Sequence, residues 1–424
     1  MKILIYTHEF PPFRGGAGVY SYDLAVGLAA LDQEVHVLTA SCDRPPLEQA
    51  GTESFATLHI HYLTVEQTQP AEARRRIARL QFDYGFDLMI VSERRAQEIA
   101  ASMPMFLLRS VAVIHGTEIL DYFCGSHPSL AMQQDEMRQF YEAAELCIAV
   151  SRATLVLAQR LIGSGRAKFV AIQNGINLDR LPLPQADAVA RVRAKYGSNA
   201  EIVFCLGRLD LDKGQDNLMR AFRQVRQKRP QAFLLIGGDG PTKDHLVQLR
   251  RDQGLENCVE LIGSIPSVDL PAYFQACDLF ALTSRSERRW EGFGLVYLEA
   301  GHYGKAVLGG NEGGVPEAIA DQVSGLIVAP RDEEAIASAL LVLLEDNALR
   351  NAMGENGRQR VRSYFNSARM ATETLQLLRL TCKTQPTRSK HCRRVVLAWH
   401  ILCETLGLTG REFFRRYRHL AGLK

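Results

Sequence analysis

The sequence predicts an α/β protein made of two successive parallel β-sheets. Short apolar runs rich in β-branched residues alternate with helix-favouring stretches along most of the chain, and uninterrupted apolar runs are typical of strands buried on both faces of a parallel sheet. Parallel neighbours need crossover helices, which the intervening stretches supply. The chain has 424 residues, which is too long for one compact core and favours two domains.

The alternation pauses once, near residues 180–198, where LPLPQADA brings two prolines. We expect strands of the first sheet at residues 2–7, 35–39, 58–63, 88–92, 111–116, 146–151 and 169–175. Strands of the second sheet are expected at residues 201–207, 233–238, 259–263, 279–283, 306–310 and 325–329. Helices follow at residues 332–346, 348–364 and 366–380. A cleft between two such sheets is a natural ligand site, because loops and helix N-termini meet at the carboxyl ends of parallel strands.

This pattern divides the chain into four parts. Residues 1–182 and 183–364 are expected to form two Rossmann-like domains, residues 365–380 a helix that packs back toward the first domain, and residues 381–424 a basic amphipathic helical tail. The tail has a net charge of +8 against a total of +3, which leaves −5 for the rest of the chain. Its aromatic and basic helix suits the surface of an anionic membrane; the alternative is a helical pair that packs on protein.

Composition excludes several classes of protein. With 46% hydrophobic and 23% charged residues the chain is neither disordered nor fibrous. It has no run of about 20 apolar residues that would span a bilayer, and its N-terminus lacks the features of a signal peptide. Nine cysteines occur without a CxxC pair, and the Cys and His residues of the tail match no zinc spacing. We therefore expect a cytoplasmic protein with reduced thiols, no metal site and no nucleic-acid partner.

The first motif is PPFRGGAGVY, residues 11–20, which follows the first strand and begins a helix. Gly15 and Gly16 allow a ligand to approach the backbone closely, and the helix start offers free N–H groups to an anion. The dinucleotide fingerprint GxGxxG is absent. The alternative is a tight strand-to-helix turn without a ligand.

The second motif is GRLDLDKG, residues 207–214, after the first strand of the second sheet. Arg208 and Lys213 lie five residues apart across a turn, and a planar fork with a compact charge suits two linked phosphates. We interpret Asp210 and Asp212 as solvated turn or cap residues rather than metal ligands. The alternative for the motif is a surface loop of mixed charge.

The third motif is EGFGLVYLEA, residues 291–300, with Glu291 before a predicted helix and Glu299 inside it. Amides at the helix start attract an anion, while carboxylates accept hydrogen bonds from hydroxyls. A ligand that is anionic in the middle and hydroxylated at both ends is a nucleotide sugar. The alternative is that Glu291 complements the helix dipole and Glu299 is solvated.

Taken together, the motifs resemble the GT-B glycosyltransferases, in particular the retaining family 4 group. The resemblance covers nearly all of residues 1–380 and rests on the Gly15–Gly16 loop, His115 in VIHGTE, NGIN, GRLDLDKG, GGDGP and the E-x7-E frame of EGFGLVYLEA. It implies that the first domain holds a glycan or lipid-linked acceptor and the second a nucleoside-diphosphate sugar.

The resemblance also implies roles for single residues. The catalytic residues would be His115, Arg208, Lys213 and Glu291. The donor-binding residues would be Gly15, Gly16, Arg208, Lys213, Ile265, Glu291, Gly292, Phe293, Gly294, Leu295 and Glu299. Arg208, Lys213 and the amide of Gly16 would neutralise the diphosphate, Glu299 would hold the ribose and Glu291 the sugar. A hexose would pass by front-side displacement with retention, and neither a metal nor another cofactor would be needed.

The loop LTSRSERRWEGFG is longer than in many relatives, and Arg285 either reaches a substrate or is solvated. The sequence does not identify the donor base, the sugar or the acceptor. A nucleotide-sugar epimerase, a sugar phosphorylase and a sugar-nucleotide-binding protein without turnover are the alternatives to transfer. Peripheral attachment to the inner face of the cytoplasmic membrane would follow from a membrane-binding tail.

Overall fold

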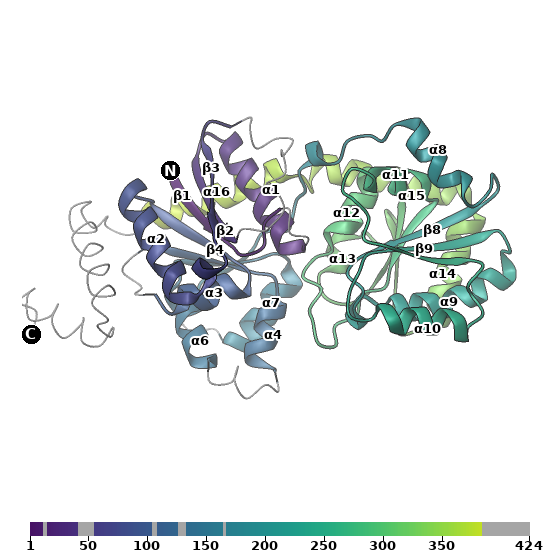
Figure 1. The fold of residues 1–424 in the computed structure, drawn as a ribbon, viewed down its shortest axis with the longest axis horizontal. Coiled ribbons are helices and arrows are strands. Elements are labelled where there is room, and N and C mark those ends of the chain that lie inside the picture. Colours follow the sequence, from purple (N-terminus) through teal and green to yellow (C-terminus); the bar gives the residue numbers. More distant parts are fainter. Residues whose placement is uncertain (12–14, 41–54, 104–107, 126–132, 164–166, 384–424) are drawn as a thin grey trace, which may run out of the picture.

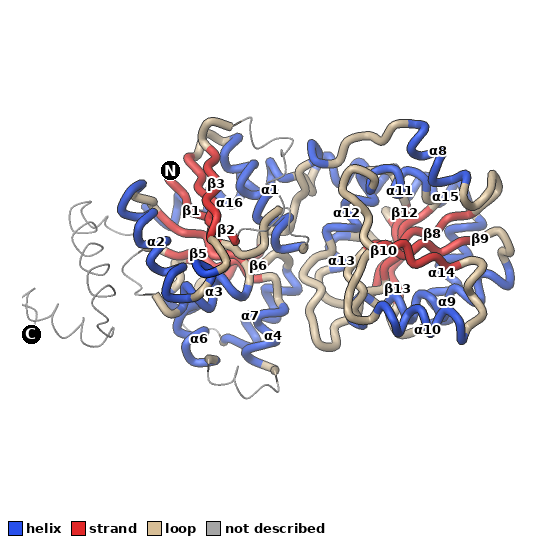
Figure 2. Tube along the Cα trace, viewed as in Figure 1, coloured by secondary structure: helices blue, strands red, loops and turns tan. Residues whose placement is uncertain are grey.

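The computed structural model describes residues 1–11, 15–40, 55–103, 108–125, 133–163 and 167–383. They form two parallel sheets side by side, each covered by helices (Figures 1 and 2). The first sheet has the order β3-β2-β1-β4-β5-β6-β7 and the second the order β10-β9-β8-β11-β12-β13. Of the predicted tail, residues 381–424, the first three belong to the last described helix, and residues 384–424 lie outside the described residues.

Every strand pair in both sheets is parallel. The strands of the first sheet are β1 Lys2–Tyr6, β2 Glu34–Ala40, β3 Leu58–Leu63, β4 Leu88–Ser92, β5 Ser110–Ile114, β6 Leu146–Ala149 and β7 Phe169–Ala171. Those of the second are β8 Glu201–Leu206, β9 Ala232–Gly237, β10 Val259–Gly263, β11 Leu279–Leu282, β12 Ala306–Gly310 and β13 Gly325–Val328. All the predicted strands are confirmed, and only the seventh is clearly shorter than predicted.

Helices connect the strands in both halves. Those of the first half are α1 Gly16–Ala30, α2 Pro70–Tyr84, α3 Arg94–Ala101, α4 Thr117–Phe123, α6 Gln134–Ala143 and α7 Arg152–Ile162. Those of the second half are α8 Ala186–Ala194, α9 Gln215–Lys228, α10 Lys243–Asp252, α11 Leu270–Ala276, α12 Leu295–His302, α13 Val315–Ala318, α14 Glu333–Glu345 and α15 Asn347–Ser363. A last helix, α16 Ser367–Lys383, follows, and the short 3₁₀ turns are η1 Glu66–Thr68, η2 Leu178–Arg180 and η3 Leu211–Lys213.

The central strand β1 shows why helices cover both faces of the first sheet. Successive side chains of a strand point to opposite faces. Leu4 and Tyr6 belong to a buried cluster with residues of α2, α3 and α6, whereas Ile3 and Ile5 belong to a cluster with residues of α1 and α16. The apolar run KILIY is therefore apolar throughout because both of its faces are buried.

The chain crosses between the two halves twice, and the crossings pair with each other. The amide of Ile176 donates to the carbonyl of Phe365, and the amide of Ser367 donates to the carbonyl of Ile176, each at 2.9 Å. A Cβ at Gly175 would lie 2.1 Å from the carbonyl oxygen of Asn366, so only glycine fits there. After the second crossing, α16 runs back onto the first half and packs against α1 (Figure 1).

A carboxylate of the second half also contacts the first half. Glu317, in α13, accepts hydrogen bonds from the amides of Arg152 and Ala153 at 3.0 and 2.9 Å. These amides begin α7, where a negative charge is favoured by the helix dipole and the free N–H groups. This contact helps to fix the relative position of the two sheets. Within the described ranges, no helix combines the length and apolar character needed to cross a bilayer.

Candidate active site

Four of the predicted site residues follow strands at the ends that meet the junction of the two halves. Gly16 begins α1 after β1, and His115 follows β5 in the first half. Lys213 ends η3 after β8, and Glu291 precedes α12 after β11. A Cβ at Gly292 would lie 2.4 Å from the carbonyl oxygen of His115, so the two halves touch at this point.

The ammonium of Lys213 lies 2.5 Å from the carboxylate of Glu291. The hydroxyl of Ser284 donates to the same carboxylate oxygen at 2.9 Å. The turn that carries Lys213 ends at Gly214, which has a φ of +69° and whose Cβ, if present, would lie 2.1 Å from the carbonyl oxygen of Thr283. The two motifs therefore lock together, and Lys213 is held beside Glu291.

Arg208 lies on the same loop but does not share a partner with Lys213. Its half-exposed guanidinium pairs with Asp210 at 3.1 Å, and Asp210 also pairs with Arg289 at 3.6 Å. The convergence of Arg208 and Lys213 on one anion stays a prediction.

Glu9 lies next to the glycine loop and faces the second half. A Cβ at Gly15 would lie 2.4 Å from the Oε2 atom of Glu9. Burial raises the pKa of Glu9, while the positive charges of Arg289 and Arg208 act to lower it. The glycine loop and Arg208 therefore lie on opposite sides of the same junction, with Glu9 between them.

His115 sits on a turn that Glu118 holds in place. The carboxylate of Glu118 accepts hydrogen bonds from the amides of His115 and Gly116 at 2.6 and 3.1 Å. Burial lowers the pKa of His115 to about 4, so its ring is neutral at pH 7. Its Nε2 lies 3.3 Å from the hydroxyl of Ser92, and the ring meets that of Tyr20 edge to face. A neutral imidazole in this place can exchange hydrogen bonds with a hydroxyl without adding charge.

The start of α12 presents backbone rather than side chains. Phe293 and Leu295 are buried in the core of the second half, and Gly294 has a φ of +88° that a side chain would strain. Ile265, just after β10, is buried as well, and its Cδ1 atom lies where a Cβ of Gly237 would fall. A ligand at these positions would meet backbone groups, which explains why residue types there carry little information on the donor base.

Glu299 is buried inside α12 and accepts a hydrogen bond from Arg180 at 2.9 Å. The alternative that Glu299 is solvated is therefore wrong. Arg180, which sequence reasoning did not single out, comes from the connection between the two halves and lies three residues after the end of the NGIN motif.

Two interpretations of charged residues are corrected. Asp212 is not solvated: it is buried, and its carboxylate accepts from the amides of Glu287 and Arg288 at 3.2 and 2.9 Å. Arg285 is not solvated either, because its buried guanidinium pairs with both carboxylate oxygens of Asp216 at 3.0 and 3.1 Å. Both side chains serve to anchor the long loop, since an unpaired buried charge would be strongly unfavourable.

Trp290 was also missed by the sequence analysis, although it directly precedes Glu291. Its indole N–H donates to the hydroxyl of Thr154 at 2.9 Å, and its backbone N–H donates to the hydroxyl of Thr117 at 3.2 Å. A Cβ at Gly116 would lie 2.2 Å from the indole Cδ1. The long loop of the second half thus docks on the His115 turn through one aromatic side chain.

We expect Trp290 to report the contact between the halves by its fluorescence. The chain has two tryptophans, so in a Trp399→Phe protein all tryptophan emission comes from Trp290. Because the indole is partly buried at the junction, its emission should lie at shorter wavelength than in the denatured protein. Replacing both Thr117 and Thr154 with alanine should move it to longer wavelength, since each lost hydrogen bond weakens the contact by about 1 kcal/mol.

The matched control is Thr372→Ala on α16, where the hydroxyl donates to a carbonyl of its own helix, that of Ala368. This variant should leave the emission unchanged. Emission of the folded Trp399→Phe protein at the wavelength of the denatured protein would contradict the docked position of Trp290.

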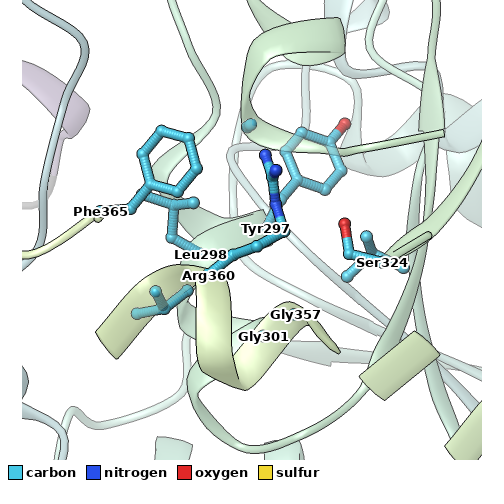
Figure 3. A pocket seen from close by; sticks show the side chains of 10 residues that line it. Tyr297, Leu298, Gly301, Ser324, Gly357, Arg360 and Phe365 are labelled. Carbon is cyan, nitrogen blue, oxygen red and sulfur yellow. The ribbon is translucent and has the colours of Figure 1, made fainter. Parts of the chain in front are cut away.

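A small cavity of about 10 Å³ lies between α12 and α15 (Figure 3). Tyr297, Ser324, Arg360 and Phe365 line it together with glycines of the two helices. It has room for about one water molecule, so it offers no site for a substrate.

Family models match both halves of the chain. The model described as Glycosyltransferase Family 4 matches residues 14–180, and the model described as Glycosyl transferases group 1 matches residues 190–360. The GDP-mannose-dependent alpha-(1-6)-phosphatidylinositol monomannoside mannosyltransferase of Mycolicibacterium smegmatis is 31% identical over 366 residues, which are 84% of this chain and 92% of that protein. The glycogen synthase of Mycobacterium tuberculosis H37Rv is 27% identical and covers 89% of this chain and 94% of its own.

Solved structures show the same fold. Sucrose-phosphate synthase from Thermosynechococcus elongatus superposes with a TM-score of 0.74 at 23% identity, covering 91% of this chain and all of its own. The Anabaena protein HepE in complex with UDP and glucose superposes with a TM-score of 0.73 at 23% identity, covering 90% of this chain and all of its own. The matches to both halves and to a relative over most of its length show that this chain belongs to glycosyltransferase family 4 and is a glycosyltransferase of the GT-B fold.

Proposed function

We propose that this enzyme transfers a hexose from a nucleoside-diphosphate sugar to a glycan or lipid-linked acceptor, with retention of configuration and without a metal. The observation that carries the proposal is the Lys213–Glu291 pair, which lies at the junction where Gly292 touches the His115 turn. A cation beside a hydroxyl-binding carboxylate suits the bond between a diphosphate and a sugar.

The charges at the junction support a role in releasing the diphosphate. Arg208 and Lys213 would stabilise the negative charge that develops on the departing phosphate, and the amide of Gly16 would add a hydrogen bond from the other half. Lys213 and Arg208 are paired with Glu291 and Asp210. Phosphate oxygens of the donor would join these cations as further partners.

The surroundings of Glu291 support front-side displacement rather than a covalent intermediate. A retaining glycosidase places two carboxyl groups about 5 Å apart around one bond, one of them as nucleophile. Here the carboxylate of Glu291 is held by Lys213 and Ser284, which suits binding of sugar hydroxyls. The departing phosphate oxygen would then take the proton of the acceptor, and the neutral ring of His115 would hold a hydroxyl of the donor sugar.

Relatives suggest which donors to test first. The M. smegmatis relative is named for GDP-mannose, and the HepE structure contains UDP and glucose. GDP-mannose is the first donor to test, because the relative named for it is more similar in sequence to this chain (31% identity) than HepE is (23%). The relative acts on a phosphatidylinositol mannoside, by its name, which favours a lipid-linked acceptor for this enzyme too.

A donor panel tests the proposal. Purified enzyme is incubated with GDP-mannose, UDP-glucose or UDP-N-acetylglucosamine and with a phosphatidylinositol mannoside as acceptor, with and without EDTA, and released nucleoside diphosphate is measured. We expect one donor to release its nucleoside diphosphate, at a rate that EDTA does not change. By NMR, the anomeric configuration of the transferred sugar in the product should be the same as in the donor. Isomerised donor without release would indicate an epimerase, release that requires phosphate a phosphorylase, and binding without turnover a non-catalytic protein.

We also propose that residues 381–424 attach the enzyme to the inner face of the cytoplasmic membrane. The proposal rests on the ten Lys/Arg of this segment against two Glu, which anionic lipid would attract. Flotation with vesicles containing phosphatidylglycerol should recover the full chain but not a chain ending at residue 383. Equal recovery of both would contradict the proposal.

A further inference from the structure

We infer that Arg180 is a positioning residue that holds the ribose-facing carboxylate Glu299 and ties it to helix α1, whose first residue is Gly16. The inference rests on the proposed donor site and assigns to the connection between the two halves a part in nucleotide recognition.

Arg180 ends η2, in the connection between the two halves, and bridges two carboxylates with one guanidinium. Its Nε donates to the Oδ1 and Oδ2 atoms of Asp23 at 3.2 and 3.4 Å. Its Nη2 donates to the Oε1 atom of Glu299 at 2.9 Å. Asp23 belongs to α1 in the first half and Glu299 to α12 in the second, so the bridge joins two residues that lie 276 positions apart in the chain.

Asp23 holds the guanidinium of Arg180 in place because its buried carboxylate requires a cationic partner. Its side chain is fully buried, and an isolated buried carboxylate is strongly disfavoured unless it is paired. Burial raises the pKa of Asp23 to about 6, against the lowering effects of Arg180 and of a hydrogen bond from the backbone of Asn177. The NGIN motif and Arg180 therefore both donate to the carboxylate of Asp23. With its Nε bound to Asp23, the guanidinium directs its Nη2 toward Glu299.

The planar fork of arginine is essential to this arrangement. One guanidinium can donate in two directions at once, whereas a lysine ammonium on a flexible stem acts as a single point charge. With Oε1 of Glu299 fixed by Arg180, the carboxylate cannot turn freely, and its other oxygen keeps one orientation. A ribose hydroxyl would meet an acceptor that is already in place. Binding would therefore not carry the entropic cost of ordering the side chain of Glu299.

The bridge also relates two parts of the donor site. Asp23 lies two turns beyond Gly16 along α1, and Glu299 lies one turn beyond Leu295 along α12. Arg180 thus links α1 and α12, whose first residues would face the diphosphate. The same side chain holds Glu299, which would face the ribose. Loss of Arg180 should weaken nucleotide binding mainly through the ribose and change turnover of bound donor much less.

The test compares ribose and deoxyribose nucleotides by calorimetry. GDP and 2′-deoxy-GDP, and UDP and 2′-deoxy-UDP, are titrated into the full chain, and the ratio of their Kd values is measured for the pair that binds. One hydrogen bond to a charged group should give a ratio of roughly tenfold or more in the unaltered enzyme. Arg180→Met should reduce it to about threefold or less, and kcat with saturating donor should fall much less than kcat/KM.

Conservative variants protect the test against misfolding. Arg180→Lys keeps a positive charge against Asp23 and so protects the fold, but it should lose most of the ratio because one ammonium cannot serve both carboxylates. Asp23→Asn keeps the shape of its side chain and frees the guanidinium, and it should lower the ratio too. Arg191→Met, which removes an exposed pair with Asp187 on α8, is the matched control and should leave the ratio unchanged.

Glu299→Gln separates this inference from the proposed function. If it keeps the full ratio, Glu299 does not hold the ribose and that part of the proposed function is wrong. If it removes the ratio while folded Arg180→Lys and Arg180→Met retain it, the positioning role of Arg180 is overturned. Loss of the ratio in all three variants, with Arg191→Met unaffected, supports the inference.

Discussion

Replacing Lys213 with alanine is expected to lower kcat by roughly 10²–10³-fold, the range found when one preorganised donor to a developing negative charge is removed. Lys213 is half-buried and is held beside Glu291 by a turn that Gly214 and Thr283 lock against β11. A cation that is already in place when the sugar–phosphate bond breaks stabilises the transition state more than the ground state. Initial rates with saturating donor measure the effect.

The fold should survive this substitution, which distinguishes chemistry from stability. Ser284 still donates to Glu291 in the variant, so the carboxylate keeps a partner, and the midpoint of thermal unfolding should change by only a few degrees. Lys195→Ala, which removes an exposed pair with Glu260, is the control for loss of a lysine and should keep full activity. A rate within threefold of the unaltered enzyme for Lys213→Ala would show that Lys213 does not act on the leaving group.

The sequence predicts the fold well because its signals are local. The buried parallel strands consist largely of consecutive apolar residues, as KILIY shows for β1. The glycine motifs were also readable, since Gly214 and Gly294 occupy positions of positive φ next to helix starts. Local rules of burial and backbone conformation thus place the loops that carry the site.

The supporting contacts could not be predicted because they join residues far apart in the chain. Arg180 meets a carboxylate 157 positions before it and another 119 positions after it. Trp290 meets Thr117 across 173 positions. No sequence spacing or periodicity indicates a special role for Arg180 or Trp290. An arginine in a connection between domains usually points to solvent. The signal that could have singled out Arg180 is Asp23, a carboxylate in the apolar helix VYSYDLAVGL that requires a partner.

Replacing Gly16 with alanine is expected to lower donor turnover by about 100-fold without destabilising the protein. Apart from its chain neighbours and its own helix backbone, no atom of the described residues lies within 4 Å of a Cβ built at Gly16, so a methyl group there would touch none of the packing that the structure describes. Gly16 is also the first residue of α1, and alanine favours a helix over glycine by up to about 1 kcal/mol. Thermal unfolding should therefore occur at an unchanged or slightly higher temperature.

The loss of turnover would then report on the ligand alone. If the diphosphate approaches the amide of Gly16, the methyl group occupies space that a phosphate oxygen needs, and about 3 kcal/mol of binding and transition-state stabilisation is lost with the hydrogen bond. Gly357→Ala on α15, where the nearest atom would lie at an ordinary 3.5 Å, is the matched helix substitution far from the junction and should leave the rate unchanged. A fully active Gly16→Ala enzyme would mean that the diphosphate stays clear of α1, and the cations of the second half would have to hold it without help from the first.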